Sequence, residues 1–296
     1  MSENAPPEGT EAEGAGSAAS ILERDDPALF ARAMCAPEPA RARLMVLGAF
    51  DVELSRAIGQ SRGTRTAGTE EGAMIARMRL QFWRDVLEGA REGASPPAHE
   101  VAEPLARIFA GPRMSALAPA LGLVDAREAE LDRPFDRAAF DRWAWLRFGG
   151  FVWASALLCE VKGARAETAA RTAAPGLAAA FALRTAGPMA RQGLVDLLPG
   201  LGPEARGALA RGETTAPLAD TALTLAEEGL RAISDARRLR SGIPGRATPA
   251  FLGLSAAERD LRAVIRAKGR IGGGVASGPA AGRSLGLAWM AATGRW

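Results

Sequence analysis

The sequence predicts an all-α fold in a single domain. Apolar residues recur at helical spacing through most of the chain, as Leu47, Leu54 and Ile58 do on one face of a helix. Strand-like alternation is nearly absent, and β-branched residues are scarce. No segment of 20 to 50 residues repeats along the chain, which excludes a solenoid. We therefore expect one helical bundle.

Local signals place the individual helices. Asp26 followed by Pro27 is typical of a helix N-cap with proline at the first helical position. The helix opening at Thr69 carries Met74, Met78, Phe82 and Val86 at helical spacing. Glycine–proline pairs, including Gly187-Pro188, predict loops. The expected helices after the first are 39–58, 69–89, 99–110, 114–131, 136–162, 166–186, 217–240 and 255–268.

Composition divides the chain into three parts. Residues 1–22 are rich in Glu, Ala, Gly, Ser and Pro and predict a disordered acidic tail. Residues 23–270 form the predicted helical domain. Residues 271–296 begin with a glycine-rich segment, Gly272 to Gly274, which we interpret as a hinge, and end in a short apolar helix.

Charge and residue counts exclude several classes of protein. The 37 basic and 34 acidic residues nearly balance, and no dense basic stripe stands out, so we expect no nucleic-acid partner. One histidine, His99, and two cysteines, Cys35 and Cys159, are too few for a Cys/His zinc site.

The hydropathy pattern predicts a soluble protein. The longest apolar run, residues 148–159, falls short of the roughly 20 residues that cross a bilayer. The N-terminus lacks a basic segment followed by an apolar core, so no secretory signal is expected. We predict a cytoplasmic location and leave peripheral contact with the inner membrane open.

Four segments carry a family resemblance. Their order and spacing are similar to those of the squalene/phytoene synthase family over about residues 25–270, and Arg-Leu-Gln-Phe-Trp-Arg-Asp is the most specific of them. The segments are Asp26–Phe30 with Pro39–Leu44 and Leu47–Phe50, Arg79–Asp85, Leu123–Asp132, and Leu183–Thr185 with Leu198-Pro199.

The resemblance implies an isoprenoid-synthase-like helical bundle that joins two prenyl diphosphates head to head. Such chemistry needs Mg²⁺ at the diphosphate, and Mg²⁺ prefers carboxylate and phosphate oxygens. In this family, aspartate-rich stretches on two facing helices supply the carboxylates. A spacing of three or four residues puts them on one helix face.

This sequence departs from the family at those stretches. Ser55, Arg56 and Gly59 stand where the first set of acids belongs, and Thr185 and Met189 where the second belongs. A displaced carboxylate, Asp51, lies one turn before Ser55. One such side chain is a poor trap for two or three Mg²⁺ ions, so we expect no cofactor, no metal ligands and no catalytic residues.

The retained motifs give candidate substrate-binding residues, provided that the inherited cavity is kept. The same side chains fit helix-surface or interhelical ion pairs, and the sequence leaves both interpretations open. These residues are Arg79, Gln81, Arg84, Asp85, Asp125, Glu128 and Asp132.

The resemblance is greatest to a branch of the family that has lost the aspartate-rich stretches, whose mitochondrial members act in assembly of respiratory complex I. It implies an assembly or interaction factor with a protein partner, or with a lipid or prenyl chain in the cavity. The alternative is an active prenyltransferase that uses Mg²⁺ on relocated ligands, which predicts that Asp51, Asp125 and Asp132 converge. A plain helical binding module without a cavity is the third hypothesis.

Overall fold

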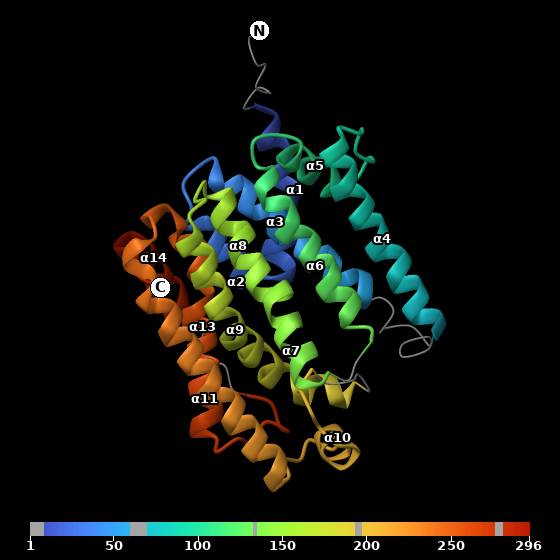
Figure 1. Cartoon of the computed structure of the whole chain (residues 1–296), viewed down its shortest axis with the longest axis vertical. Coiled ribbons are helices and arrows are strands. Elements are labelled where there is room, and N and C mark those ends of the chain that lie inside the picture. The colour runs from blue at the N-terminus through green and yellow to red at the C-terminus, as the bar shows by residue number, and fades with distance from the viewer. Residues whose placement is uncertain (1–8, 60–69, 133–134, 193–196, 276–280) are drawn as a thin grey trace.

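The computed structural model describes residues 9–59, 70–132, 135–192, 197–275 and 281–296. Every regular element within these ranges is a helix, so the predicted all-α class is confirmed (Figure 1). The long helices pack in two groups, one from each half of the chain, and each group has its own hydrophobic core.

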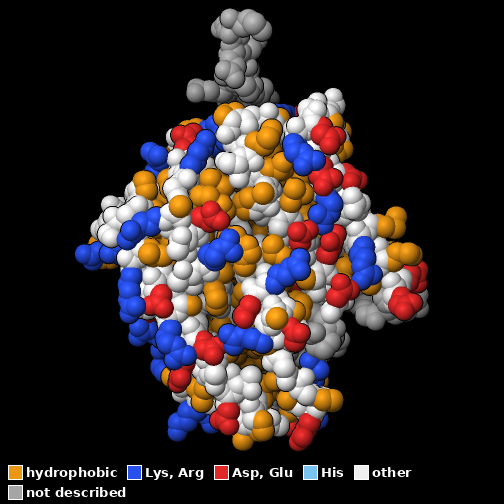
Figure 2. Space-filling view, viewed as in Figure 1, with side chains coloured by type: hydrophobic (Ala, Val, Ile, Leu, Met, Phe, Trp, Pro, Cys, Tyr) orange, Lys and Arg blue, Asp and Glu red, His pale blue; other side chains and the backbone are white. Residues whose placement is uncertain are grey.

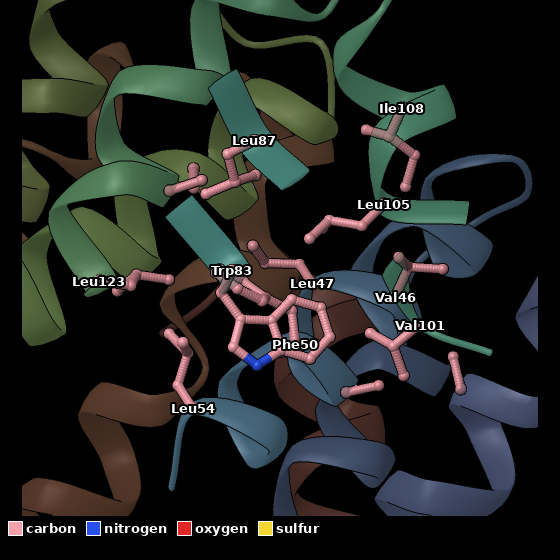
Figure 3. Close-up of a cluster of buried hydrophobic side chains, with 14 of the residues drawn as sticks. Val46, Leu47, Phe50, Leu54, Trp83, Leu87, Val101, Leu105, Ile108 and Leu123 are labelled. Atoms are coloured by element: carbon pink, nitrogen blue, oxygen red, sulfur yellow. The ribbon is translucent and has the colours of Figure 1, made fainter. Parts of the chain in front are cut away.

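The N-terminal group surrounds helix α3. Phe50 of α3 meets Trp83 of α4 edge to face at 5.4 Å between ring centroids, and Leu47, Leu54 and Leu87 close around them (Figure 3). Because aromatic side chains bury the most apolar area, this contact anchors α4 to α3. The elements are α1 (Gly9–Asp25), α2 (Pro27–Met34), α3 (Ala40–Gly59), α4 (Glu70–Glu92), α5 (Ala102–Phe109), η1 (Met114–Ala116) and α6 (Leu117–Ala129).

The C-terminal group is built on α9, which packs against α11 and α13. A Cβ on Gly176 would lie 2.6 Å from the Gly229 carbonyl oxygen, so the α9–α11 crossing requires glycine there. The elements are α7 (Arg137–Ala144), η2 (Trp145–Gly149), α8 (Gly150–Leu158), α9 (Ala164–Arg191), α10 (Pro203–Ala210), α11 (Ala216–Arg238), η3 (Arg240–Gly242), η4 (Gly245–Ala247), α12 (Thr248–Phe251), α13 (Gly253–Arg266) and α14 (Ala281–Thr293).

The N-terminal tail differs from its prediction. Residues 1–8 of the predicted disordered tail lie outside the described residues, whereas Gly9 to Asp25 form α1. Ile21 and Leu22 are buried, and Leu22 packs against Gly48 of α3. The small and acidic composition of the segment gave no sign of this packing against α3. The predicted N-cap is present, since Asp26 accepts a hydrogen bond from the Leu29 amide at 2.8 Å.

Helix α9 runs through Gly187-Pro188, where the sequence predicted a loop. A Cβ on Gly187 would lie 2.5 Å from the carbonyl oxygen of Gly272, so this glycine serves close packing instead of ending the helix. Helix α4 likewise continues past Gly89 to Glu92, while its predicted first residue, Thr69, lies outside the described residues.

The glycine-rich segment is packed and does not have the form of the predicted hinge. Gly272 donates its amide hydrogen to the hydroxyl of Thr214 at 2.9 Å and accepts a hydrogen bond from Arg191 at 2.7 Å. At the C-terminus, Trp296 stacks on Phe251 with ring centroids 4.4 Å apart. Residues beyond 270 therefore contact the main helical body at both ends of the segment.

Candidate functional site

A cavity of about 240 Å³ lies between the two helical groups. Its walls come from α2, α3, η2, α8, α9, α12 and α13. The apolar part of the lining includes Leu44, Phe148, Phe151, Leu177 and Phe181, and the charged part consists of Asp26, Arg32, Asp51, Arg147, Arg184 and Asp260.

Asp51 is the carboxylate of α3 that faces this cavity, and two arginines hold it. Arg147 makes a bidentate pair with it, Nη1 to Oδ1 at 2.8 Å and Nη2 to Oδ2 at 3.0 Å. Arg127 of α6 approaches Oδ1 at 3.4 Å. Arg147 reaches Asp51 from a π-helical turn, η2, between α7 and α8. Such turns interrupt α-helices often at functional sites.

Glu130 completes the group on its buried side. It accepts hydrogen bonds from Arg127 at 3.2 Å and from the indole nitrogen of Trp143 at 3.1 Å, and its oxygen lies 3.9 Å from Arg147. We call Asp51, Arg127, Glu130 and Arg147 the buried acid–arginine cluster. Its two carboxylates and two guanidiniums cancel in charge. Burial lowers the pKa of Arg147 from its ordinary value, and the nearby Arg127 lowers it further.

The residues expected at the positions of the family's acids make contacts with other groups. Ser55 accepts a hydrogen bond from Arg127 at 2.5 Å, and Arg56 pairs with Asp25 at 2.6 Å and with Glu53. On the facing helix, Thr185 donates to the carbonyl of Phe181 at 2.8 Å, and the side chain of Met189 is buried. None of these positions presents a carboxylate to the cavity.

The residues present do not fit a Mg²⁺–diphosphate cluster. Both oxygens of Asp51 are bound by guanidinium groups. Within the described ranges, no group of three or more His, Cys, Asp or Glu side chains could hold a metal ion. Mg²⁺ prefers a near-octahedral shell of oxygens. Of the three carboxylates that line the cavity, Asp51 is bound by Arg147, Asp26 accepts a hydrogen bond from the Leu29 amide, and Asp260 lies 3.8 Å from Arg184. That the chain needs no metal stays a prediction.

Arg32 and Arg184 add positive charge on the other side of the cavity. The Nε of Arg32 is buried and has no hydrogen-bond partner. Burial lowers the pKa of Arg32; Asp26 opposes that effect, and Arg184 adds to it. The Nε of Arg184 lies 3.8 Å from Asp260.

The seven predicted binding residues lie outside this cavity, on the surface where α4 meets α6. Arg84 pairs with Asp125 at 2.8 Å and with Glu128 at 2.9 Å. Asp132 pairs with Arg77 at 2.7 Å. The remaining three, Arg79, Gln81 and Asp85, are exposed, and Gln81 donates to Asp85 at 2.6 Å. The structure therefore places Arg84, Asp125, Glu128 and Asp132 in surface ion pairs, and none of the seven residues lines the cavity.

Relocated metal ligands require Asp51, Asp125 and Asp132 to converge, and they do not. Asp51 alone lines the cavity, and each of the three is paired with arginine. A Mg²⁺ site built from these three side chains is therefore not formed.

Arg147, Arg32 and Asp260 are charged cavity residues that sequence reasoning missed. Arg147 is a charged residue beside a long apolar run, and Arg32 lies three residues after buried Leu29 on α2. A cation on an otherwise apolar helix face signals a buried partner or ligand, because an isolated buried charge is costly.

Helix α4 also exposes an apolar stripe. Met74, Met78 and Phe82 are 57%, 67% and 36% exposed, whereas Val86 on the same helix is buried. Hydrophobic side chains are visible at the surface along α4, and acidic and basic side chains are mixed over the rest of that face (Figure 2). The helical spacing of the stripe was predicted, but its exposure was not.

The fold and cavity define an all-α protein of the isoprenoid-synthase type, and comparison with known proteins agrees. The sequence model of the squalene/phytoene synthase family matches residues 22–277, so the chain belongs to that family. No curated protein sequence matches the chain.

Solved structures show the same fold at low sequence identity. A dehydrosqualene synthase in complex with ligand aligns with TM-score 0.75 and 13% identity, over 97% of this chain and 98% of that chain. The squalene synthase HpnC from Alicyclobacillus acidocaldarius gives 0.70 and 15%, over 89% and 97%. The complex of TcSQS with the ligand E5700 gives 0.67 and 11%, over 94% and 86%. Across the residues described, no helix is long and apolar enough to span a bilayer.

Proposed function

We propose that this family member does not catalyse Mg²⁺-dependent head-to-head prenyl transfer and acts instead as a binding and interaction factor. The observation that carries the proposal is the bidentate pair between Asp51 and Arg147. A guanidinium fork occupies the oxygens that a metal would need, and it brings its own positive charge to the same position.

The size of the cavity supports the proposal. Sites for drug-sized ligands range from roughly 300 to 1,000 Å³. A cavity of about 240 Å³ is smaller than that range, and head-to-head condensation requires two prenyl chains at once. One chain of a lipid or prenyl compound is the occupant that its volume and apolar walls favour.

The exposed stripe on α4 supports an interaction role. Methionine side chains are flexible and polarisable, so surfaces rich in them adapt to protein partners. An exposed apolar stripe along one helix face is a candidate interaction surface. The partner we propose is a subunit or intermediate in the assembly of respiratory complex I, met in the cytoplasm or at the face of the inner membrane.

Diphosphate release tests the loss of catalysis. Purified protein is incubated with farnesyl or geranylgeranyl diphosphate and Mg²⁺, with Mn²⁺ as a second metal, and inorganic diphosphate is measured. We expect no turnover above a no-protein blank. Turnover well above the blank that disappears in the Asp51→Asn variant would establish an active prenyltransferase and overturn the proposal.

Genetic complementation tests the interaction role. The gene is removed from its host, and assembled complex I is measured on native gels after return of the full chain or a variant. We expect loss of the assembled complex, rescue by the full chain, and no rescue by the double variant Met74→Glu with Met78→Glu. Met114→Glu, an exposed methionine off α4, is the matched control and should rescue. Unchanged complex I after gene removal would exclude this role.

A further inference from the structure

Arg32 is the cavity arginine whose guanidinium has no ion-pair partner among the described residues. Within the described part of the chain, no carboxylate lies within ion-pair distance of its guanidinium, and its Nε lacks a hydrogen-bond partner. A guanidinium taken out of water without an ion-pair partner is destabilising. The fold retains it nonetheless on α2, between apolar Leu29 and Ala33.

The acids around Arg32 are committed to other groups. Asp26 caps α2 through the Leu29 amide, and Asp51 is held by Arg147. Asp260 lies beside Arg184. Arg184 repels the charge on Arg32, whereas Asp26 and Asp51 attract it without forming an ion pair with it. An ion-pair position at the Arg32 guanidinium is therefore left open to an anionic ligand.

We propose that Arg32 and Arg184 bind the phosphate or carboxylate head of a single-chain amphiphile without a divalent metal, while its chain lies against the cavity's apolar wall. That wall includes Leu177, Phe148, Phe151 and Phe181. The inference deepens the proposed function and rests on it, because a metal-free site is needed only where Mg²⁺ is not bound.

The charged side chains of the cavity suit the anionic head group of such a ligand. Arginine binds phosphate and carboxylate through two parallel N–H···O bonds, which are about twice as strong as neutral hydrogen bonds. The buried acid–arginine cluster is already neutral, so it neither attracts nor repels the head group strongly. Gly253 at the start of α13 leaves the space that Arg32 occupies, since a Cβ there would lie 2.6 Å from its Nη1.

The test measures binding of decyl phosphate below its micelle concentration by calorimetry, in EDTA and separately with Mg²⁺. Decanol and inorganic phosphate are the comparison ligands, which separate the chain from the head group. We expect one site per chain, a Kd that Mg²⁺ changes by less than twofold, and at least tenfold weaker binding of both comparison ligands. Binding that requires Mg²⁺, or equal binding of inorganic phosphate, would overturn the inference.

Three variants separate a ligand role from a structural one. Arg32→Met should weaken decyl phosphate binding at least tenfold. It should not lower the urea midpoint, because it replaces an unpaired charge with an uncharged side chain of similar size. Gly253→Ala keeps the charge but displaces the guanidinium, and should weaken binding to a smaller extent. Arg262→Met is the matched control. It removes an exposed arginine of α13 that lies outside the cavity, and it should bind decyl phosphate normally.

The outcomes of this test are distinct from those of the diphosphate assay. Unchanged decyl phosphate binding in both Arg32→Met and Gly253→Ala would refute the inference even if no diphosphate is released. Diphosphate release would refute the proposed function even if decyl phosphate binds in EDTA.

Discussion

Two arginine–carboxylate groups join α6 to its neighbours, and they differ in what surrounds them. The buried acid–arginine cluster sits at the cavity, where the side chain of Asp51 is 13% exposed. The pair of Arg84 with Asp125 lies at the α4–α6 surface, where Asp125 is 42% exposed. The same chemistry is therefore screened by water at the surface and unscreened in the cavity.

The segment that most resembles the family is therefore not the one that lines the cavity. The Arg84 pair belongs to the segment with the strongest resemblance to the family, yet it points away from the cavity. In the buried cluster, Asp51 lies on the part of α3 that departs from the family, and Asp51 and Arg147 line the cavity. The motif that most resembles the family holds two helices together, whereas Asp51 and Arg147 set the charge at this part of the cavity wall.

The largest expected effect is the loss of one arginine from the buried cluster. Arg147→Met leaves Asp51 and Glu130 with only Arg127, so a buried charge is uncompensated, at a cost of about 3–5 kcal/mol in the free energy of unfolding. Urea denaturation measures it. Arg84→Met is the matched surface variant, with an expected cost of about 1 kcal/mol or less. Equal losses for the two variants would contradict the comparison.

A double variant sharpens the comparison. Removing Asp51 together with Arg147, as Asp51→Asn with Arg147→Met, leaves Arg127 and Glu130 balanced. We expect most of the stability lost in Arg147→Met to return, because the cost came from the unpaired charge. The coupling energy from the double-mutant cycle should exceed that of Arg84 with Asp125, for which we expect about 1 kcal/mol or less. A coupling no larger than at the surface would show that the cluster is open to solvent.

Added salt should weaken the coupling energy of the surface ion pair more than that of the buried acid–arginine cluster, because it screens exposed charges more strongly. Raising ionic strength from 0.1 to 1 M shortens the Debye length from about 10 to about 3 Å. We expect the coupling between Arg84 and Asp125 to shrink at high salt, whereas that between Asp51 and Arg147 stays nearly constant. Repeating the two mutant cycles in urea with added NaCl measures both, and parallel loss of both couplings would count against burial of the cluster.

The smallest effect concerns a half-buried pair between α11 and α13. Burial would raise the pKa of Glu258, but hydrogen bonds from Arg237 and Arg262 outweigh it and hold the pKa below its ordinary value of 4.5. A lowered folded-state pKa adds stability above the ordinary pKa, and that stability is lost as pH falls through the folded value. Between pH 6 and 3, Glu258→Gln should therefore lose less stability than the parent chain. An unchanged acid-dependence would contradict this assignment.

The helical class could be predicted because most helices carry their own signals. Asp26 predicts its cap locally, and the α3 face from Leu47 to Ile58 follows from spacing alone. The failures come from contacts between distant segments. Gly187 fits a helix interior because residue 272 packs on it, and no local pattern near Gly187 shows that neighbour. Helix α10, which begins at Pro203, was not among the expected helices.

The candidate site could be predicted only in part, for the same reason. Asp51 was identified as the displaced carboxylate of α3, and it does line the cavity. Its partner Arg147 lies 96 residues away, and a single sequence gives no means of pairing them. The exposure of Met74 and Met78 was equally hidden, because spacing shows which residues share a face but not whether that face is covered.

The most direct test of the metal-free cavity is a crystal structure of the protein soaked with Mn²⁺ and a non-hydrolysable farnesyl diphosphate analogue, with anomalous diffraction recorded to locate the metal. The account predicts no manganese peak between α3 and α9, with Asp51 still paired to Arg147. A manganese ion coordinated by Asp51 and the diphosphate, with Arg147 displaced, would contradict it.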